Sequence, residues 1–137
     1  MKAKVGRGSG FRGVLDYALG KDEGLIVGGN MSGQDPRQLA AEFGTFRALR
    51  PDVDRPVWHA SFALAPGERL PEMHWGQIAD AIHKGMGFGH DAPFVAIRHL
   101  AGEDQNTPIG KGPTTEHIHF IASRIDGNGS VWHGQWE

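Results

Sequence analysis

The sequence has no cysteine and only one tyrosine among its 137 residues. Without cysteine the chain forms neither disulfide bonds nor thiolate zinc sites, and it has no cysteine nucleophile. Any metal ion must therefore be held by histidine, aspartate or glutamate. The chain also lacks an apolar run of about 18 residues, and its start, MKAKVGRGSG, lacks the apolar segment of a signal peptide. These absences predict a soluble chain that is not exported, and the missing cysteines fit a reducing cytosol.

An excess of positive charge is missing too. The formal net charge is −2 at pH 7 and the pI is about 6.4, so the chain lacks the overall basic character of many nucleic-acid binders. The charge is unevenly distributed, however. Residues 1–13 contain no acid, five Gly or Ser residues and the cations Lys2, Lys4, Arg7 and Arg12. This segment is either an arm that binds DNA phosphates or a solvated tail.

Hydrophobic periodicity predicts an α+β fold. The length suits one domain with a real core, since 39% of the residues are apolar. Because the predicted strands alternate in polarity, we expect a central antiparallel sheet with the helices packed on one face. The expected helices lie at about 10–19, 35–51 and 71–87, and the expected strands at about 56–64, 92–100 and 116–125. We also expect a short strand and turn over residues 24–33, and a hairpin turn with a short apolar strand within residues 126–137.

Two histidines share one face of the last of these strands. In EHIHFIASRI, residues i and i+2 point the same way, so His117 and His119 lie opposite Ile118 and Phe120. If the apolar pair faces the helices, the histidines face away from them. His99, at the end of the preceding strand, offers a third imidazole. The alternatives are ordinary packing for the pair, and for His99 a hydrogen bond to the backbone at the rim of the fold.

Three neutral imidazoles with open coordination positions suit a divalent ion that acts as a Lewis acid. Imidazole favours Mn, Zn, Ni or Co over Mg, which prefers oxygen ligands. We expect Mg or Mn as the ion, with Zn, Ni or Co as alternatives.

The single tyrosine, Tyr17, lies on the first predicted helix, about 130° from the centre of its apolar stripe. We therefore expect its hydroxyl to lie outside the core, where it could react. A phenol ionises only near about pH 10, so a tyrosine nucleophile needs a nearby cation, base or metal-bound phosphate. The alternative is an ordinary amphipathic surface tyrosine.

Several segments, in order along nearly the whole chain, resemble the relaxase/mobilisation nuclease family, the plasmid-encoded members of the HUH endonucleases. They are SGFRGVLDYAL, GGNMSG, PRQLAAEFGTFRALRP, PVWHASFALAPGE, FVAIRH and EHIHFIASRI. The resemblance implies an HUH-like fold over residues 1–137 as one relaxase domain, which continues beyond residue 137 in the full-length protein. It also implies a bacterial, cytoplasmic and plasmid-encoded protein that does not insert into membranes.

By the same resemblance, the protein is a site-specific nickase of single-stranded DNA at a plasmid transfer origin, working with accessory relaxosome proteins. Tyr17 then matches the nucleophile that becomes joined to the 5′ end of the DNA. His117 and His119 match the HUH pair, and His99 matches the histidine that completes the metal triad. Ser61 resembles the middle motif, which is associated with DNA positioning.

The sequence departs from the family pattern in the spacing of the triad. Seventeen residues separate His99 from His117, where the family usually has an acidic residue and a short turn. Glu103 and Asp104 are candidates for that acid/base residue. Loop closure costs grow slowly with length, so the triad can still assemble.

Two other functions fit the same sequence. One is an origin DNA-binding module that has lost competent cleavage. The other is a His-ligated metallohydrolase of small substrates, in which Tyr17 has no role.

Overall fold

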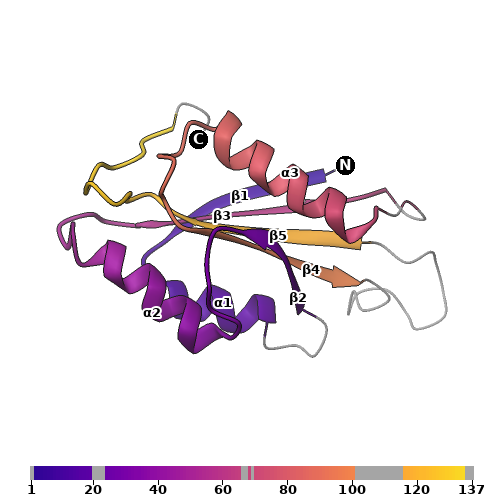
Figure 1. Ribbon diagram of the computed structural model, residues 1–137, viewed down its shortest axis with the longest axis horizontal. Helices are drawn as coiled ribbons and strands as arrows, with labels where there is room; N and C mark the ends of the chain where they lie inside the picture. The colour runs from indigo at the N-terminus through magenta and orange to yellow at the C-terminus, as the bar shows by residue number, and fades with distance from the viewer. Residues whose placement is uncertain (1, 20–23, 66–67, 69, 101–115, 135–137) are drawn as a thin grey trace.

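The computed structural model describes residues 2–19, 24–65, 68, 70–100 and 116–134, which form one antiparallel sheet and three helices (Figure 1). The strand order across the sheet is β1-β3-β5-β4-β2, and every pairing is antiparallel. This arrangement confirms the expected α+β class. The elements are β1 (Lys2–Gly8), α1 (Phe11–Leu19), β2 (Gly24–Gly29), α2 (Pro36–Arg47), β3 (Val57–Ala63), α3 (Glu72–Gly85), β4 (Phe94–Leu100) and β5 (Glu116–Ser123).

The expectation that the helices share one face of the sheet is wrong. Helix α3 covers one face, while α1 and α2 cover the other (Figure 1). The reason is that the central strands are apolar on both sides. Phe94 and Phe120 point to the α3 side, whereas Val95 and Ile121 point to the α1/α2 side, and all four are at most 4% exposed. Two apolar faces require two covering layers.

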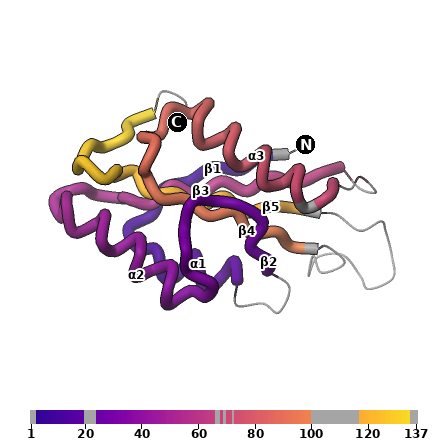
Figure 2. The backbone as a smooth tube through the Cα atoms, viewed as in Figure 1, coloured from indigo at the N-terminus to yellow at the C-terminus, as the bar shows by residue number. Residues whose placement is uncertain are grey.

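The basic N-terminal segment is not an arm or a tail, because residues 2–8 form the edge strand β1 (Figure 2). This strand pairs with β3 and sets Lys4 opposite Ser61 and Arg7 opposite Trp58. Alternation in KAKV was the available signal for a strand, but the glycines that follow weaken it. The placement matters for the site, since it fixes which cations share a face with the histidines.

Two local features position the covering helices. Asp35 caps α2 by accepting a hydrogen bond from the Gln38 backbone N–H at 2.8 Å, and Pro36 occupies the first turn, as the sequence predicts. Glycines allow α3 to approach β2 closely, because a Cβ added at Gly28 would lie 3.0 Å from the Cα of Gly76.

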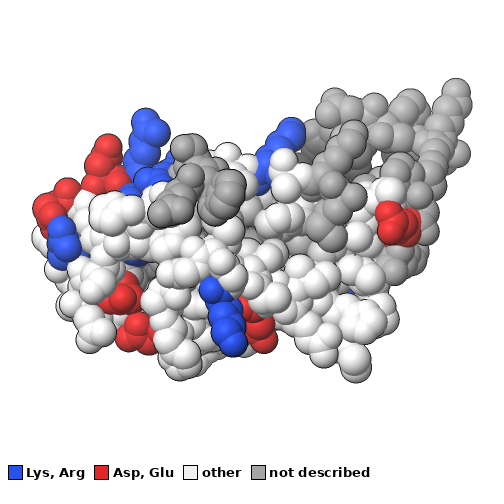
Figure 3. Space-filling view, turned by 90° about the horizontal axis from the view of Figure 1, so that it is seen from above, with Lys and Arg blue, Asp and Glu red and all other residues white. Residues whose placement is uncertain are grey.

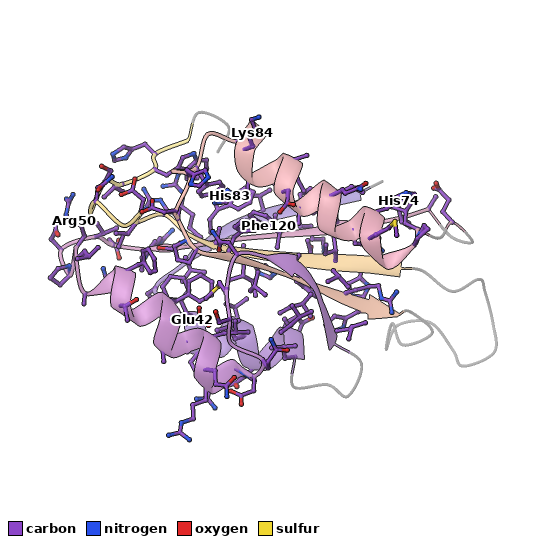
Figure 4. All side chains as sticks on the ribbon, in the orientation of Figure 1. Glu42, Arg50, His74, His83, Lys84 and Phe120 are labelled. Atoms are coloured by element: carbon purple, nitrogen blue, oxygen red, sulfur yellow. The ribbon has the colours of Figure 1, made fainter. Side chains whose placement is uncertain are left out.

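The sequence places His83 at the flank of the apolar stripe of α3, which predicts a surface residue, but its side chain is buried at 6% exposure on the inner side of α3 (Figure 4). Its ring stacks on Phe94 with the ring centroids 4.0 Å apart, and its Nε2–H donates to the carbonyl oxygen of Ala92 at 3.0 Å. This satisfied hydrogen bond permits the burial. The same pattern places His74 at the other flank of the stripe and predicts a surface residue there, and His74 is exposed.

Candidate active site: three histidines under the tyrosine helix

The sheet brings the three predicted ligands together. His99 on β4 lies directly opposite His117 on β5, and His119 follows on the same face. One ring nitrogen of each histidine lies within 4.8 Å of those of the other two. The ring centroids are 4.9 Å apart for His99 and His119, 5.0 Å for His99 and His117, and 5.3 Å for His117 and His119.

This nearly equilateral triangle fits a shared cation. An ion about 2.1 Å from each nitrogen would lie roughly 3.2 Å from each ring centre, so coordination angles of about 90° to 110° give centroid separations of roughly 4.5 to 5.2 Å. Two of the observed separations, 4.9 and 5.0 Å, lie within this range and the third, 5.3 Å, lies just above it. The donor set also fits, because three imidazoles leave coordination positions for water or a phosphate oxygen.

Outer hydrogen bonds orient the rings of His99 and His119. The Nε2–H of His99 donates to the carbonyl oxygen of Ala18 at 2.5 Å, and Nδ1 of His119 lies 3.0 Å from Nε2 of His59. Ligating histidines commonly use their second nitrogen in this way. The nitrogens left for an ion are Nδ1 of His99 and Nε2 of His119.

The environment of the site keeps His119 uncharged. Burial, aided by the neighbouring imidazoles of His59, His99 and His117, lowers the pKa of His119 to about 3, and its exposed fraction is 5%. Burial also lowers the pKa of His59. A neutral imidazole has a lone pair to offer, so no proton has to be displaced from His119 near neutral pH.

Helix α1 holds the tyrosine beside this cluster. Phe11, Leu15 and Ala18 are buried against the sheet, which turns Tyr17 outward at 57% exposure. The Tyr17 ring meets the ring of His119 edge-on, with centroids 5.7 Å apart and planes at 85°. The histidines therefore face the tyrosine helix, and the expectation that they point away from the helices is wrong. The carbonyl bonded by His99 belongs to the residue after Tyr17, so the same contact links the C-terminal turn of α1 to the triad.

Comparison with known protein families now decides the class. The family model described as relaxase, MobA/VirD2-like, nuclease domain matches residues 17–137. The chain belongs to the relaxase family. No match is found among curated proteins or among solved structures. The suspected family is thereby confirmed, and with it an HUH-like fold and a DNA-nicking endonuclease as the general class of activity.

The predicted DNA-contacting residues of this relaxase domain fall into separate places. Lys4, Ser61 and His119 occupy successive strands in one row, with Lys4 opposite Ser61 and Ser61 opposite His119. Directly paired residues share a face, so this row leads from the edge of the sheet to the triad. Lys2 lies in the next row, opposite Ala63.

Two predicted DNA contacts lie elsewhere. Arg7 belongs to the α3 face, where its guanidinium donates to the carbonyl oxygen of His133 at 2.6 Å and lies over the Trp132 ring. Arg12 is exposed on α1 and pairs with Asp16 at 3.0 Å. Glu103 and Asp104, the candidate acid/base residues, lie outside the described residues.

Sequence reasoning missed His59 as a neighbour of the candidate site. The period of β3 put it on the more polar face with Ser61, but its partner His119 is 60 positions away in the sequence. Only the pairing of β3 with β5 shows that the two rings meet.

The side of the molecule that carries α3 bears both basic and acidic side chains (Figure 3). Figure 3, viewed from the side of α3, shows the described basic and acidic side chains scattered and of both signs. No helix within the described ranges is long and apolar enough to cross a membrane.

Proposed function

We propose that the protein nicks single-stranded DNA at a specific site, with Tyr17 as the nucleophile and His99, His117 and His119 as the ligands of a divalent ion, Mg or Mn first. The nick would start conjugative transfer or mobilisation of a plasmid, with accessory relaxosome proteins at the transfer origin. The observation that carries the proposal is the convergence of the three histidines, with the ring of His119 centred 5.7 Å from that of the only tyrosine of a relaxase-family chain.

The reaction exchanges one phosphodiester for another. The phenolic oxygen of Tyr17 forms a bond to the scissile phosphorus while the bond from phosphorus to the 3′ oxygen breaks. The phenol loses a proton and the departing 3′ oxygen gains one, so protons balance. The 5′ end of the DNA remains joined to Tyr17, and because an ester bond is retained, the cut strand can later be rejoined.

Each part of the chain has a distinct task in this reaction. A divalent ion held by the triad supplies positive charge that stabilises the developing charge on the phosphate oxygens. Helix α1 fixes the tyrosine beside the triad, which saves the entropy of bringing the reactants together. The row from Lys4 to Ser61 supports a path for the DNA backbone toward the histidines.

The test is covalent capture. A pool of labelled single-stranded oligonucleotides is incubated with the protein and Mn²⁺ or Mg²⁺, and products are resolved on a denaturing protein gel. We expect a labelled protein band that needs the ion, disappears with EDTA and is absent from Tyr17→Phe. Sequencing the captured DNA identifies the nick site.

Covalent capture, together with an assay of DNA binding and an assay of ester hydrolysis, separates the alternatives. An adduct that persists in Tyr17→Phe would show that another residue is the nucleophile. Tight binding without an adduct would favour an origin-binding module, and metal-dependent ester hydrolysis that ignores Tyr17 would favour a small-substrate hydrolase.

A further inference from the structure

His59 reaches His119 from the neighbouring strand along a diagonal of the sheet. Ser61 is the residue directly opposite His119, and His59 is opposite Ile121, two positions further along β5. Diagonal neighbours are far enough apart that only a long or ring side chain can bridge them. The two imidazoles do so with Nε2 of His59 3.0 Å from Nδ1 of His119, their planes 31° apart.

A hydrogen bond between two neutral imidazoles requires an N–H on one and a lone pair on the other. If Nδ1 of His119 carries the proton, it donates to Nε2 of His59, and Nε2 of His119 keeps a lone pair for an ion. If His59 were the donor, the proton of His119 would sit on Nε2 and block ligation. The hydrogen bond therefore decides whether His119 can act as a ligand.

We propose that His59 is a positioning residue that accepts a hydrogen bond from His119 and holds it in the Nδ1–H tautomer with Nε2 turned to the ion. This inference rests on the proposed function only in taking the triad as the metal site. Ser61, although directly opposite His119, is not needed for this role because the bond bypasses it. Loss of such an outer partner typically lowers metal affinity about 10- to 100-fold.

The matched variants are His59→Gln and His59→Asn. Both are polar and uncharged, but the Gln amide can place its oxygen near the position of the imidazole Nε2, whereas the shorter Asn falls short of His119. Co²⁺ is titrated into each purified protein and followed by calorimetry and by its visible absorption, with His117→Ala as the blank for the site. We expect Asn to weaken Co²⁺ binding about 10- to 100-fold and Gln to restore most of the loss.

His83→Gln is the control for losing a buried histidine elsewhere. His83 also makes a hydrogen bond and two ring contacts, but it lies on the α3 face, so its replacement should leave Co²⁺ affinity unchanged. Thermal unfolding of each variant separates a damaged fold from a damaged site.

Nitrogen-detected NMR of the wild-type histidines gives a measurement that does not depend on any variant folding. The proposal requires His119 to be Nδ1–H before the ion is added. An Nε2–H tautomer, or unchanged Co²⁺ affinity in a folded His59→Asn protein, would overturn it. An unchanged affinity together with a normal DNA adduct would leave the proposed function standing, whereas Co²⁺ binding that depends on His59 without any adduct would leave the positioning role and remove the nickase.

Discussion

The two faces of the sheet are made by alternate residues of the same strands, yet they do different work. On the α3 face the row through Ala60, Phe120 and Ala96 is buried and apolar, and so is Trp58, which pairs with Ala122 in the next row. On the α1/α2 face β4 is apolar at Val95 and Ile97 and ends at His99, whereas its antiparallel neighbour β5 begins with His117 and His119 and becomes apolar at Ile121. Burial on both faces makes the central strands rigid, and a rigid support places catalytic side chains precisely. Adjacent residues of one strand therefore have different roles in this fold: those on one face stabilise it, and those on the other face form the candidate site.

Replacing His117 by Ala should produce the largest effect on the reactive face. Removing one of three ligands should forfeit the charge stabilisation of several kcal/mol that a catalytic metal supplies, so we expect nicking to fall by about 10³-fold or more. The unfolding free energy should change by less than about 1 kcal/mol, since His117 is only partly buried. Rates of adduct formation and urea unfolding measure the two quantities. Nicking at the wild-type rate would remove His117 from the site.

Phe120→Ala should show the opposite pattern. Phe120 is fully buried and its ring meets Trp58 and Phe94 with centroids 5.6 Å and 5.4 Å apart. The cavity left by removing this buried ring should lower the unfolding free energy by about 3 to 5 kcal/mol. Urea unfolding gives the value, and a loss under about 1 kcal/mol would contradict the contrast between the faces. The fraction of Phe120→Ala that stays folded should bind Co²⁺ with the affinity of the wild type.

Local sequence patterns predict some features of the fold and of the candidate site but not others. The cap at Asp35, the face shared by His117 and His119, and the outward placement of Tyr17 follow from local periods of the chain, so they could be predicted. Tertiary packing, and not the local sequence, decides which helices cover each face of the sheet. The polarity of H-x-H therefore suggested an uncovered face, although the same face is apolar at Val95 and Ile121. The role of His59 depends on a diagonal between β3 and β5, which no local pattern contains.

Lys4→Ala should have a smaller effect that appears only with DNA. Lys4 is exposed and lies in the row that leads through Ser61 to His119. Losing one phosphate contact to single-stranded DNA should weaken affinity a few-fold. It should also reduce the slope of the logarithm of the binding constant against the logarithm of the salt concentration by about 0.7. Lys84→Ala is the matched control, because Lys84 is exposed on α3, over the other face (Figure 4). Fluorescence anisotropy at several salt concentrations measures both, and equal slopes for the two variants would place the DNA path elsewhere.

The smallest expected effect concerns the pH dependence of stability on the α3 face. Burial lowers the pKa of His83, against an opposing hydrogen bond to Ala92 and the charge of Asp80, and His90 adds to the lowering. The unfolded chain binds a proton near the ordinary value of about 6.5 while the folded chain does not. Stability is therefore complete above that value and declines as the pH falls below it. The lowered pKa values of His59 and His119 change the stability in the same direction.

His83→Gln keeps a donor for the carbonyl oxygen of Ala92 but cannot titrate. Between pH 7.5 and 5.5 the unfolding free energy of this variant should therefore fall by less than that of the wild type, by up to about 1.4 kcal/mol. Metal-free urea unfolding at both pH values measures the difference. Identical declines would mean that His83 is protonated equally readily in the folded and unfolded chains.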